Sequence, residues 1–181
     1  MRTSARMLAT LLALTVLPIA VSAGPIAGVD AMSATVLQKH QSSFSGLALR
    51  MRVHPPQLIP QVSLMPTIEY WRNSSNVQPF DIQSTRKDAT MGVDLRYDIP
   101  REGFHPYVGT GFGLHFISTE VNAPSLGLQH ASDSLIKGGV SLLGGVTFGL
   151  AGRLENMIEL KYHHIPDHSQ LKINWGLAIN L

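Results

Sequence analysis

The final stretch of the chain, residues 170–181, alternates strictly between large apolar side chains and polar or small ones. Leu171, Ile173 and Trp175 begin one row, whereas Lys172 belongs to the other. Because successive side chains of a β-strand point to opposite faces, this pattern predicts a strand with one fully apolar face. Such a face must be covered, and lipid is a candidate cover.

The same period of two recurs along the chain. Each segment sets a row of apolar side chains against a row rich in glycine, hydroxyl groups or charge. The predicted strands are 45–53, 62–71, 89–98, 105–117, 139–150, 157–164 and 170–181. Most connections alternate between short turns, at 55–60, 99–104 and 151–155, and long polar segments, at Arg72–Asp88 and Ser118–Ile136, with a further short turn at 166–168. Short turns at one rim and long loops at the other are typical of bacterial outer-membrane barrels.

Seven strands leave the barrel one short, because single-chain bacterial barrels close with an even number. The missing strand lies before Ser45 or within Arg72–Asp88. We favour residues 26–42, since both ends of the mature chain then lie at the periplasmic rim. The rival is the short segment Phe80–Ile82. Neither segment alternates cleanly.

The contents of the two faces indicate which one meets the membrane. A soluble lipocalin-like barrel or a sandwich also alternates, but it carries its charge outside. Here the polar face carries small and charged residues that suit a crowded interior with nearly balanced charge. They are Gly46, Gly92, Gly109, Gly111, Gly113, Gly139, Gly145, Gly149 and Gly176, with Arg50, Arg52, Arg96, Lys161, Lys172, Glu69, Asp94, Asp98 and Glu159. We therefore predict an all-β, antiparallel up-and-down transmembrane β-barrel of eight strands.

The N-terminus has the layout of an export signal. Arg2 and Arg6 precede an apolar run from Met7 to Ala20, and Val21-Ser-Ala23 forms a cleavage site. The alternative, a membrane anchor, needs roughly 20 apolar residues, more than this run supplies. The predicted organisation is thus a signal peptide at 1–23, an N-terminal segment with the candidate first strand at 24–43, and a barrel domain at 44–181.

Charge and cysteine content narrow the function classes. The signal holds two of the 14 basic residues and none of the 12 acidic ones, so the mature chain has no net charge and a nucleic-acid partner loses support. The chain has no cysteine, which excludes disulfides and thiolate metal sites. The export signal and the apolar face together predict the outer membrane of a Gram-negative bacterium as the location.

Two segments resemble a known family. Pro106-Tyr-Val-Gly-Thr-Gly-Phe-Gly-Leu-His-Phe116 is similar to the glycine-alternating strand of the outer-membrane β-barrel domain family, which includes OmpA-like and OmpX-like small barrels. The pair Val146–Leu150 and Ile158–Tyr162 resembles that family's following hairpin. The resemblance covers residues 44–181 and implies eight strands, periplasmic termini and insertion by the outer-membrane assembly machinery. That machinery reads a terminal strand usually ending in Phe, where this chain has Leu181.

Three patterns raise chemical hypotheses. His163, His164 and His168, with Asp167 and Glu159, are residue types that bind zinc, but alternation sends His163 and His164 to opposite faces. A lipid A deacylase-like hydrolase would need Ser two residues after a histidine, whereas this chain offers only the adjacent pair His168-Ser169. The Gly109-x-Gly111-x-Gly113 run lies in a strand and not before a helix, so it does not predict a phosphate loop.

The inward charges leave two alternatives, a narrow pore or a paired plug. An eight-stranded barrel is just wide enough for side chains to fill, which favours the plug. We accordingly expect a non-enzymatic, porin-like outer-membrane protein with a structural or surface-interaction role, and we assign no catalytic, cofactor or metal residue. Expected partners are outer-membrane lipid, lipopolysaccharide and the assembly machinery, with the long loops as contact surfaces. A lipid-modifying hydrolase and a soluble lipocalin-like barrel remain alternatives.

Overall fold

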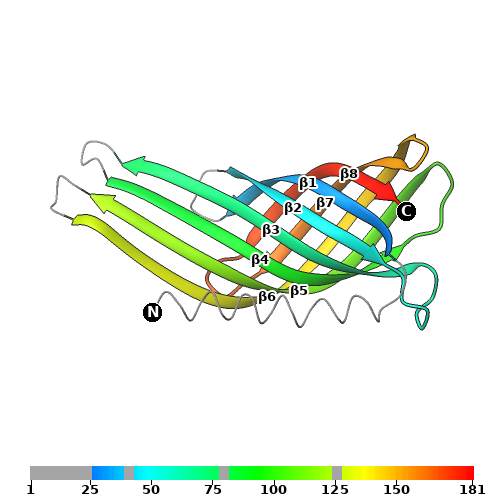
Figure 1. Cartoon of the computed structure of the whole chain (residues 1–181), viewed down its shortest axis with the longest axis horizontal. Helices are drawn as coiled ribbons and strands as arrows, with labels where there is room; N and C mark the ends of the chain where they lie inside the picture. Colours follow the sequence, from blue (N-terminus) through cyan, green and yellow to red (C-terminus); the bar gives the residue numbers. More distant parts are fainter. Residues whose placement is uncertain (1–25, 39–42, 78–81, 124–127) are drawn as a thin grey trace.

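Eight antiparallel strands, each bonded to its neighbours in the sequence, close into a barrel in the computed structural model (Figure 1). The structure describes residues 26–38, 43–77, 82–123 and 128–181. The strands are β1 (Ile26–Gln38), β2 (Phe44–Val53), β3 (Val62–Val77), β4 (Ile82–Asp98), β5 (Phe104–Ala123), β6 (Leu128–Ala151), β7 (Leu154–His164) and β8 (Gln170–Asn180). Within these ranges no helix has the length and apolar character to cross a membrane. The all-β up-and-down barrel is confirmed.

The strand that the sequence places within residues 26–42 is β1, which pairs with both β2 and β8 and so closes the barrel. Its outward row includes Ala31, Ser33 and Thr35, all exposed. Because these side chains are small or polar, the apolar alternation is weak there. The rival segment lies mostly in 78–81, outside the described residues. The signal peptide at 1–23 also lies outside them and stays a prediction.

The wall has two heights. Strands β3 to β6 contain 16, 17, 20 and 24 residues, whereas β1, β2, β7 and β8 contain 13, 10, 11 and 11. The four long strands run past the others at the end opposite the C-terminus (Figure 1). They form a sheet that projects from one side of the barrel, which we call the projecting sheet.

The prediction of long loops at Arg72–Asp88 and Ser118–Ile136 is wrong. Most of these residues belong to two hairpins, with β3 paired to β4 as far as Val77 and Ile82, and β5 paired to β6 as far as Ala123 and Leu128. Most side chains of these hairpins are polar and, apart from Asp88 and Ala123, at least partly exposed on both faces, so no regular apolar alternation marks them. Backbone hydrogen bonds hold the paired strands together in these segments, although their sequence shows no strand pattern.

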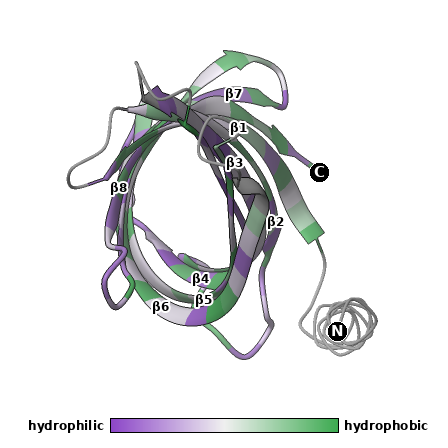
Figure 2. Ribbon diagram, turned by 90° about the vertical axis from the view of Figure 1, so that its left-hand side faces the viewer, coloured by the Kyte–Doolittle hydropathy of each residue, from purple (hydrophilic) through white to green (hydrophobic). Residues whose placement is uncertain are grey.

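Apolar side chains cover the outside of the barrel, and the inside holds mainly polar and charged side chains with two smaller apolar clusters. Figure 2 shows hydrophobic and hydrophilic residues following one another along the strands of the barrel. Leu47, Leu142 and Trp175 are each about two-thirds exposed, at 67%, 66% and 65%. By contrast, Arg50 and Lys161 are buried at 1% and 2% exposure. This inversion of the soluble-protein rule is the main property of the fold, because water alone does not solvate such an outer surface well.

Inward glycines make room for the interior side chains. A Cβ atom on Gly145 would lie 2.5 Å from the Tyr107 hydroxyl, and one on Gly111 would collide with the Asp94 carboxylate. The Gly109-x-Gly111-x-Gly113 run therefore lies within β5, where it leaves room for side chains of the neighbouring strands such as Leu143 and Asp94, and it does not form a turn.

Candidate functional site

A carboxylate at the centre of the first interior cluster accepts four hydrogen bonds from three side chains. Arg50 donates two parallel hydrogen bonds to Glu159, at 2.8 Å each. The Tyr107 hydroxyl donates to the same carboxylate at 3.1 Å, and the Asn174 amide donates at 2.8 Å. The Arg96 guanidinium lies 3.6 Å from the centre of the Tyr107 ring. Strands β2, β4, β5, β7 and β8 are thus joined across the lumen.

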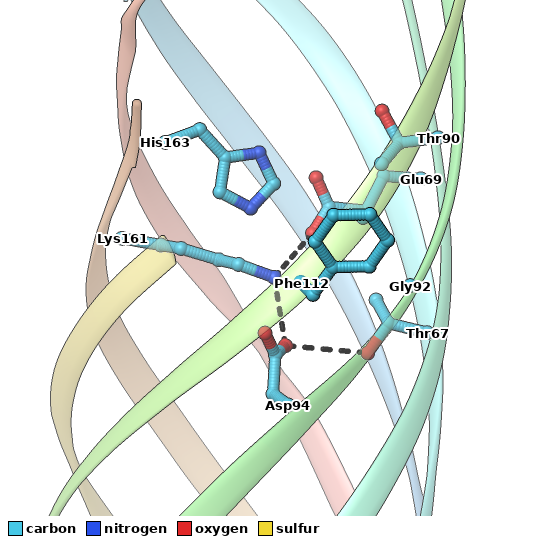
Figure 3. Close-up of a pocket in the computed structure, with 9 residues that line it drawn as sticks. Thr67, Glu69, Thr90, Gly92, Asp94, Phe112, Lys161 and His163 are labelled. Carbon is cyan, nitrogen blue, oxygen red and sulfur yellow. Dashed lines mark hydrogen bonds and ion pairs between the residues drawn. The ribbon is translucent and has the colours of Figure 1, made fainter. Parts of the chain in front are cut away.

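A second cluster is centred on the Lys161 ammonium, which lies between two carboxylates (Figure 3). Its Nζ is 2.8 Å from Glu69 and 2.7 Å from Asp94. Lys172 also bonds to Glu69, while Ser141 donates to Asp94 at 3.0 Å. Charges removed from water are costly unless they are paired and hydrogen-bonded, and here both carboxylates are.

The space above Lys161 is almost completely occupied. Among the described residues, the recess lined by Thr67, Phe112 and His163 is too small for a water molecule (Figure 3). The polar side chains that line it, including Asp94 and Lys161, point inward from strands on several sides of the barrel, whereas Phe112 is 54% exposed. At this level the lumen is packed.

A third buried cluster surrounds His115. Its Nδ1 lies 3.0 Å from Asp88 and 2.8 Å from the Thr90 hydroxyl. Gln170 donates to Asp88 at 3.4 Å, and the His163 ring packs edge-on against His115 with 5.0 Å between ring centres. Alternation along the predicted strand 105–117 sends His115 to the polar face, but the sequence does not predict this cluster, because Asp88 falls in a segment predicted to be a loop.

The histidines at the end of β7 do not converge on one point. His163 is buried in the lumen at 3% exposure, whereas His164 is exposed on the outer face and His168 lies in the turn between β7 and β8. Glu159 is bound to Arg50. No set of three metal-ligating side chains occurs in the parts of the chain that the structure describes. The grouping that the sequence raised as a zinc site is therefore not assembled.

Ser169, the serine considered for a hydrolase, contacts His164 and not the adjacent His168 of the sequence pair. Ser169 Oγ lies 3.3 Å from His164 Nδ1 and donates to the Ile165 carbonyl at 3.3 Å. This contact is on the exposed face of the rim. Within 26–38, 43–77, 82–123 and 128–181, no hydrogen bond joins a carboxylate to His164 in the manner of a Ser-His-Asp triad.

Buried apolar side chains and the β7–β8 turn lie at the end of the barrel opposite the C-terminus. Phe44 and Trp71 pack at a tilt of 44° with ring centres 4.6 Å apart, and Ile165 from the turn is fully buried. Lys137 fixes the turn by donating to the Pro166 carbonyl at 2.8 Å. Partial burial, with the nearby positive charges of Arg86 and Lys137, lowers the pKa of His168 in this turn.

Among the residues that the structure describes, the projecting sheet has two edges without a neighbouring strand, which we call its open edges. β2 pairs with β3 no further than Trp71, and β7 pairs with β6 only from Val140 onward. Ile99 donates its N–H to the Pro106 carbonyl at 2.9 Å. Because backbone groups alternate in direction along a strand, even-numbered residues of β5 bond toward β4 and odd-numbered ones bond toward β6. By the observed register, odd-numbered residues of β6 bond to β5. The backbone groups of Ser132, Ser134 and Ile136 consequently face away from β5.

Comparisons with known proteins agree with this geometry. No protein-family model and no curated protein match the sequence. Solved structures do: Neisserial surface protein A has a TM-score of 0.64 at 12% identity, with 85% of this chain and 95% of that one covered. The fold is that of the small outer-membrane β-barrels. A major outer membrane protein from Thermus thermophilus has a TM-score of 0.62 at 11% identity, with 87% and 100% covered.

A third similar structure is Ail, the attachment invasion locus protein of Yersinia pestis, in complex with the heparin analogue sucrose octasulfate. Its TM-score is 0.59 at 12% identity, and 86% of this chain and 97% of that one are covered. Each of these barrels is matched over nearly its whole length. At such low identity the likeness shows the fold, which is also the fold that the sequence resemblance implied.

Proposed function

We propose that this protein is an integral protein of the bacterial outer membrane, with a structural and surface-interaction role and no enzymatic activity. The observation that carries the proposal is the exposed apolar belt on a closed barrel. Leu49, Ile68, Leu142, Leu160 and Trp175 are between 54% and 66% exposed and come from five strands. Lipid solvates such a surface, whereas a soluble lipocalin-like barrel keeps its apolar side chains inside.

The orientation follows from the strand lengths. Outer-membrane barrels have short periplasmic turns and longer extracellular segments. The turns 54–61, 99–103 and 152–153 lie at the rim of the C-terminus, and the projecting sheet lies at the other. The projecting sheet is therefore assigned to the cell surface, and insertion is assigned to the outer-membrane assembly machinery acting on β8.

A heat-shift gel tests the membrane barrel. We expect the protein to remain in the membrane fraction and, after extraction in mild detergent, to migrate differently before and after boiling, because a closed barrel resists dodecyl sulfate until heated. Recovery of the whole protein in a detergent-free periplasmic extract, with no heat shift, would contradict the proposal.

For the interior we propose a plug and not a channel. The support is the chain of buried ion pairs from Arg50–Glu159 to Lys161–Asp94, together with the packed recess above Lys161. Planar-bilayer recording of the purified protein is expected to show no stable conductance steps. Reproducible, ion-selective steps would overturn the plug.

The surface-interaction role rests on the projecting sheet. Its open edges present backbone donors and acceptors at Ser132, Ser134 and Ile136, and such edges pair with extended segments of other proteins. A lipid-modifying hydrolase has less support, since in the described part of the chain the lumen carboxylates Glu69, Asp94 and Glu159 all bond to cations. Lipid A of unchanged mass in cells with and without the protein is the expected result.

A further inference from the structure

Two cations lie side by side on the outer face of the projecting sheet. Arg72 on β3 and Lys87 on β4 are directly opposite each other in the register. Both point outward, because Trp71 and Asp88 beside them point into the lumen and are buried at 1% and 0% exposure. Like charges at directly opposed positions destabilise a strand pair, so this arrangement favours an anion between or above them.

The neighbouring carboxylate does not balance the pair. Lys87 Nζ lies 2.8 Å from Glu120, and these side chains are 32% and 35% exposed. Arg72, Lys87 and Glu120 together keep one net positive charge on this face. Ser118, directly opposite Lys87 on β5, adds a hydroxyl group at the same level.

The rows of outward side chains before and after these cations differ in chemistry along the strands, from the barrel wall below to the tip of the projecting sheet above. Directly below, Tyr70 and Ala89 are paired, and the row continues through Phe116 to Ile136, with Tyr70 47% and Ile136 52% exposed. Directly above, the hydroxyl groups of Ser74 and Thr85 lie 3.1 Å apart, and Glu120, the partner of Lys87, follows next to Thr85 in the same row. From below upward the surface is thus apolar, cationic and then hydroxyl-rich.

That order matches a phosphorylated glycolipid, whose acyl chains, phosphate and sugars follow in the same sequence. We infer that Arg72 and Lys87 bind the headgroup phosphate of an outer-leaflet glycolipid, with its acyl chains against the Tyr70–Ile136 row. The inference rests on the proposed membrane placement and gives the lipid partner a site. Cation–phosphate hydrogen bonds are among the strong ones in proteins, and the two side chains reach the anion from adjacent strands.

The test uses folded, detergent-purified protein and native mass spectrometry. The probes are lipid A carrying both phosphates, the same lipid without phosphates, and inorganic phosphate. We expect half-saturation by phosphorylated lipid A at about tenfold lower concentration than by the dephosphorylated lipid, as two charge-assisted hydrogen bonds allow. The double variant Arg72→Gln/Lys87→Gln should lose this preference.

The matched control is Arg101→Gln/Arg153→Gln, which removes the same charge from exposed positions at the other rim. It should keep the preference. Equal loss in both double variants, unchanged binding in Arg72→Gln/Lys87→Gln, or displacement of the lipid by inorganic phosphate at equal concentration would each overturn the inference. A heat-shift gel distinguishes failure of the proposed function from failure of this site. A wild-type protein with no heat shift contradicts the proposed membrane barrel. A wild-type protein that shows the heat shift but has no preference for phosphorylated lipid contradicts the phosphate site alone.

Discussion

The contribution of an ion pair to the stability of this protein depends on how deeply the pair is buried. Glu159 and Arg50 are fully buried with a bidentate contact, whereas Lys87 and Glu120 form a pair of similar length that remains about one-third exposed. Water screens the second pair and competes for it, while the first has no solvent to replace a lost partner. The same kind of contact therefore has a different energetic weight at the two places.

Replacing Glu159 by Gln is expected to lower the free energy of unfolding by about 3–5 kcal/mol, because it leaves the Arg50 charge buried without a counter-ion. The matched variant Glu120→Gln should cost about 0–1 kcal/mol. Urea unfolding of both variants in lipid vesicles, followed by tryptophan fluorescence, measures the difference. Equal costs would mean that the lumen is wet enough to screen its charges, which would also weaken the plug.

Single positions could be assigned to a face from the sequence, but their partners could not. Alternation placed Arg50, Glu69, Lys161 and Glu159 on one face, and all four are buried in the lumen. Which carboxylate meets which cation depends on the stagger between strands, and a period of two carries no information on that stagger. The Asp88–His115 contact shows the limit most clearly, since its strand was not recognised at that point.

At the level of strands, the pattern identified those that pass through the apolar belt and missed their extensions. The extra residues of β3 to β6 are polar on both faces and resemble loop composition. They stay paired because each extension continues a hairpin already aligned in the barrel wall. β1 was placed by a counting argument and not by its own pattern.

Proline substitution tests the open edge of β6. Ser134→Pro removes an N–H that faces no neighbouring strand in the described structure, so the hairpin should keep its backbone bonds. Asp133→Pro removes an N–H directed at Thr119 and is expected to cost one ladder bond, about 0.5–1.5 kcal/mol. Hydrogen–deuterium exchange should show faster exchange around Thr119 in Asp133→Pro only. Comparable exchange in both variants would contradict the assigned edge.

For the whole molecule, the fold, the exposed apolar belt and the likeness to small outer-membrane barrels agree. Burial of polar groups and exposure of apolar ones make the barrel stable in lipid and unfavourable in water. The sequence alone could reach this class because one face of nearly every strand is apolar. The sequence alone did not predict the projecting sheet, because its open edges and its opposed cations depend on the strand register.

The two tryptophans allow a direct test, because they lie on opposite sides of the wall. Trp175 is 65% exposed on the apolar face, and Trp71 is 1% exposed inside the barrel. The chain has no other tryptophan. The variants Trp71→Phe and Trp175→Phe therefore each report on one side.

Both variants should be refolded into vesicles whose acyl chains carry bromine, a short-range quencher of tryptophan fluorescence. We predict strong quenching in Trp71→Phe, which retains the outward Trp175, and little quenching in Trp175→Phe. Strong quenching of Trp71 with none of Trp175, or no quenching of either, would contradict a barrel that faces lipid with its apolar side and keeps its polar side within.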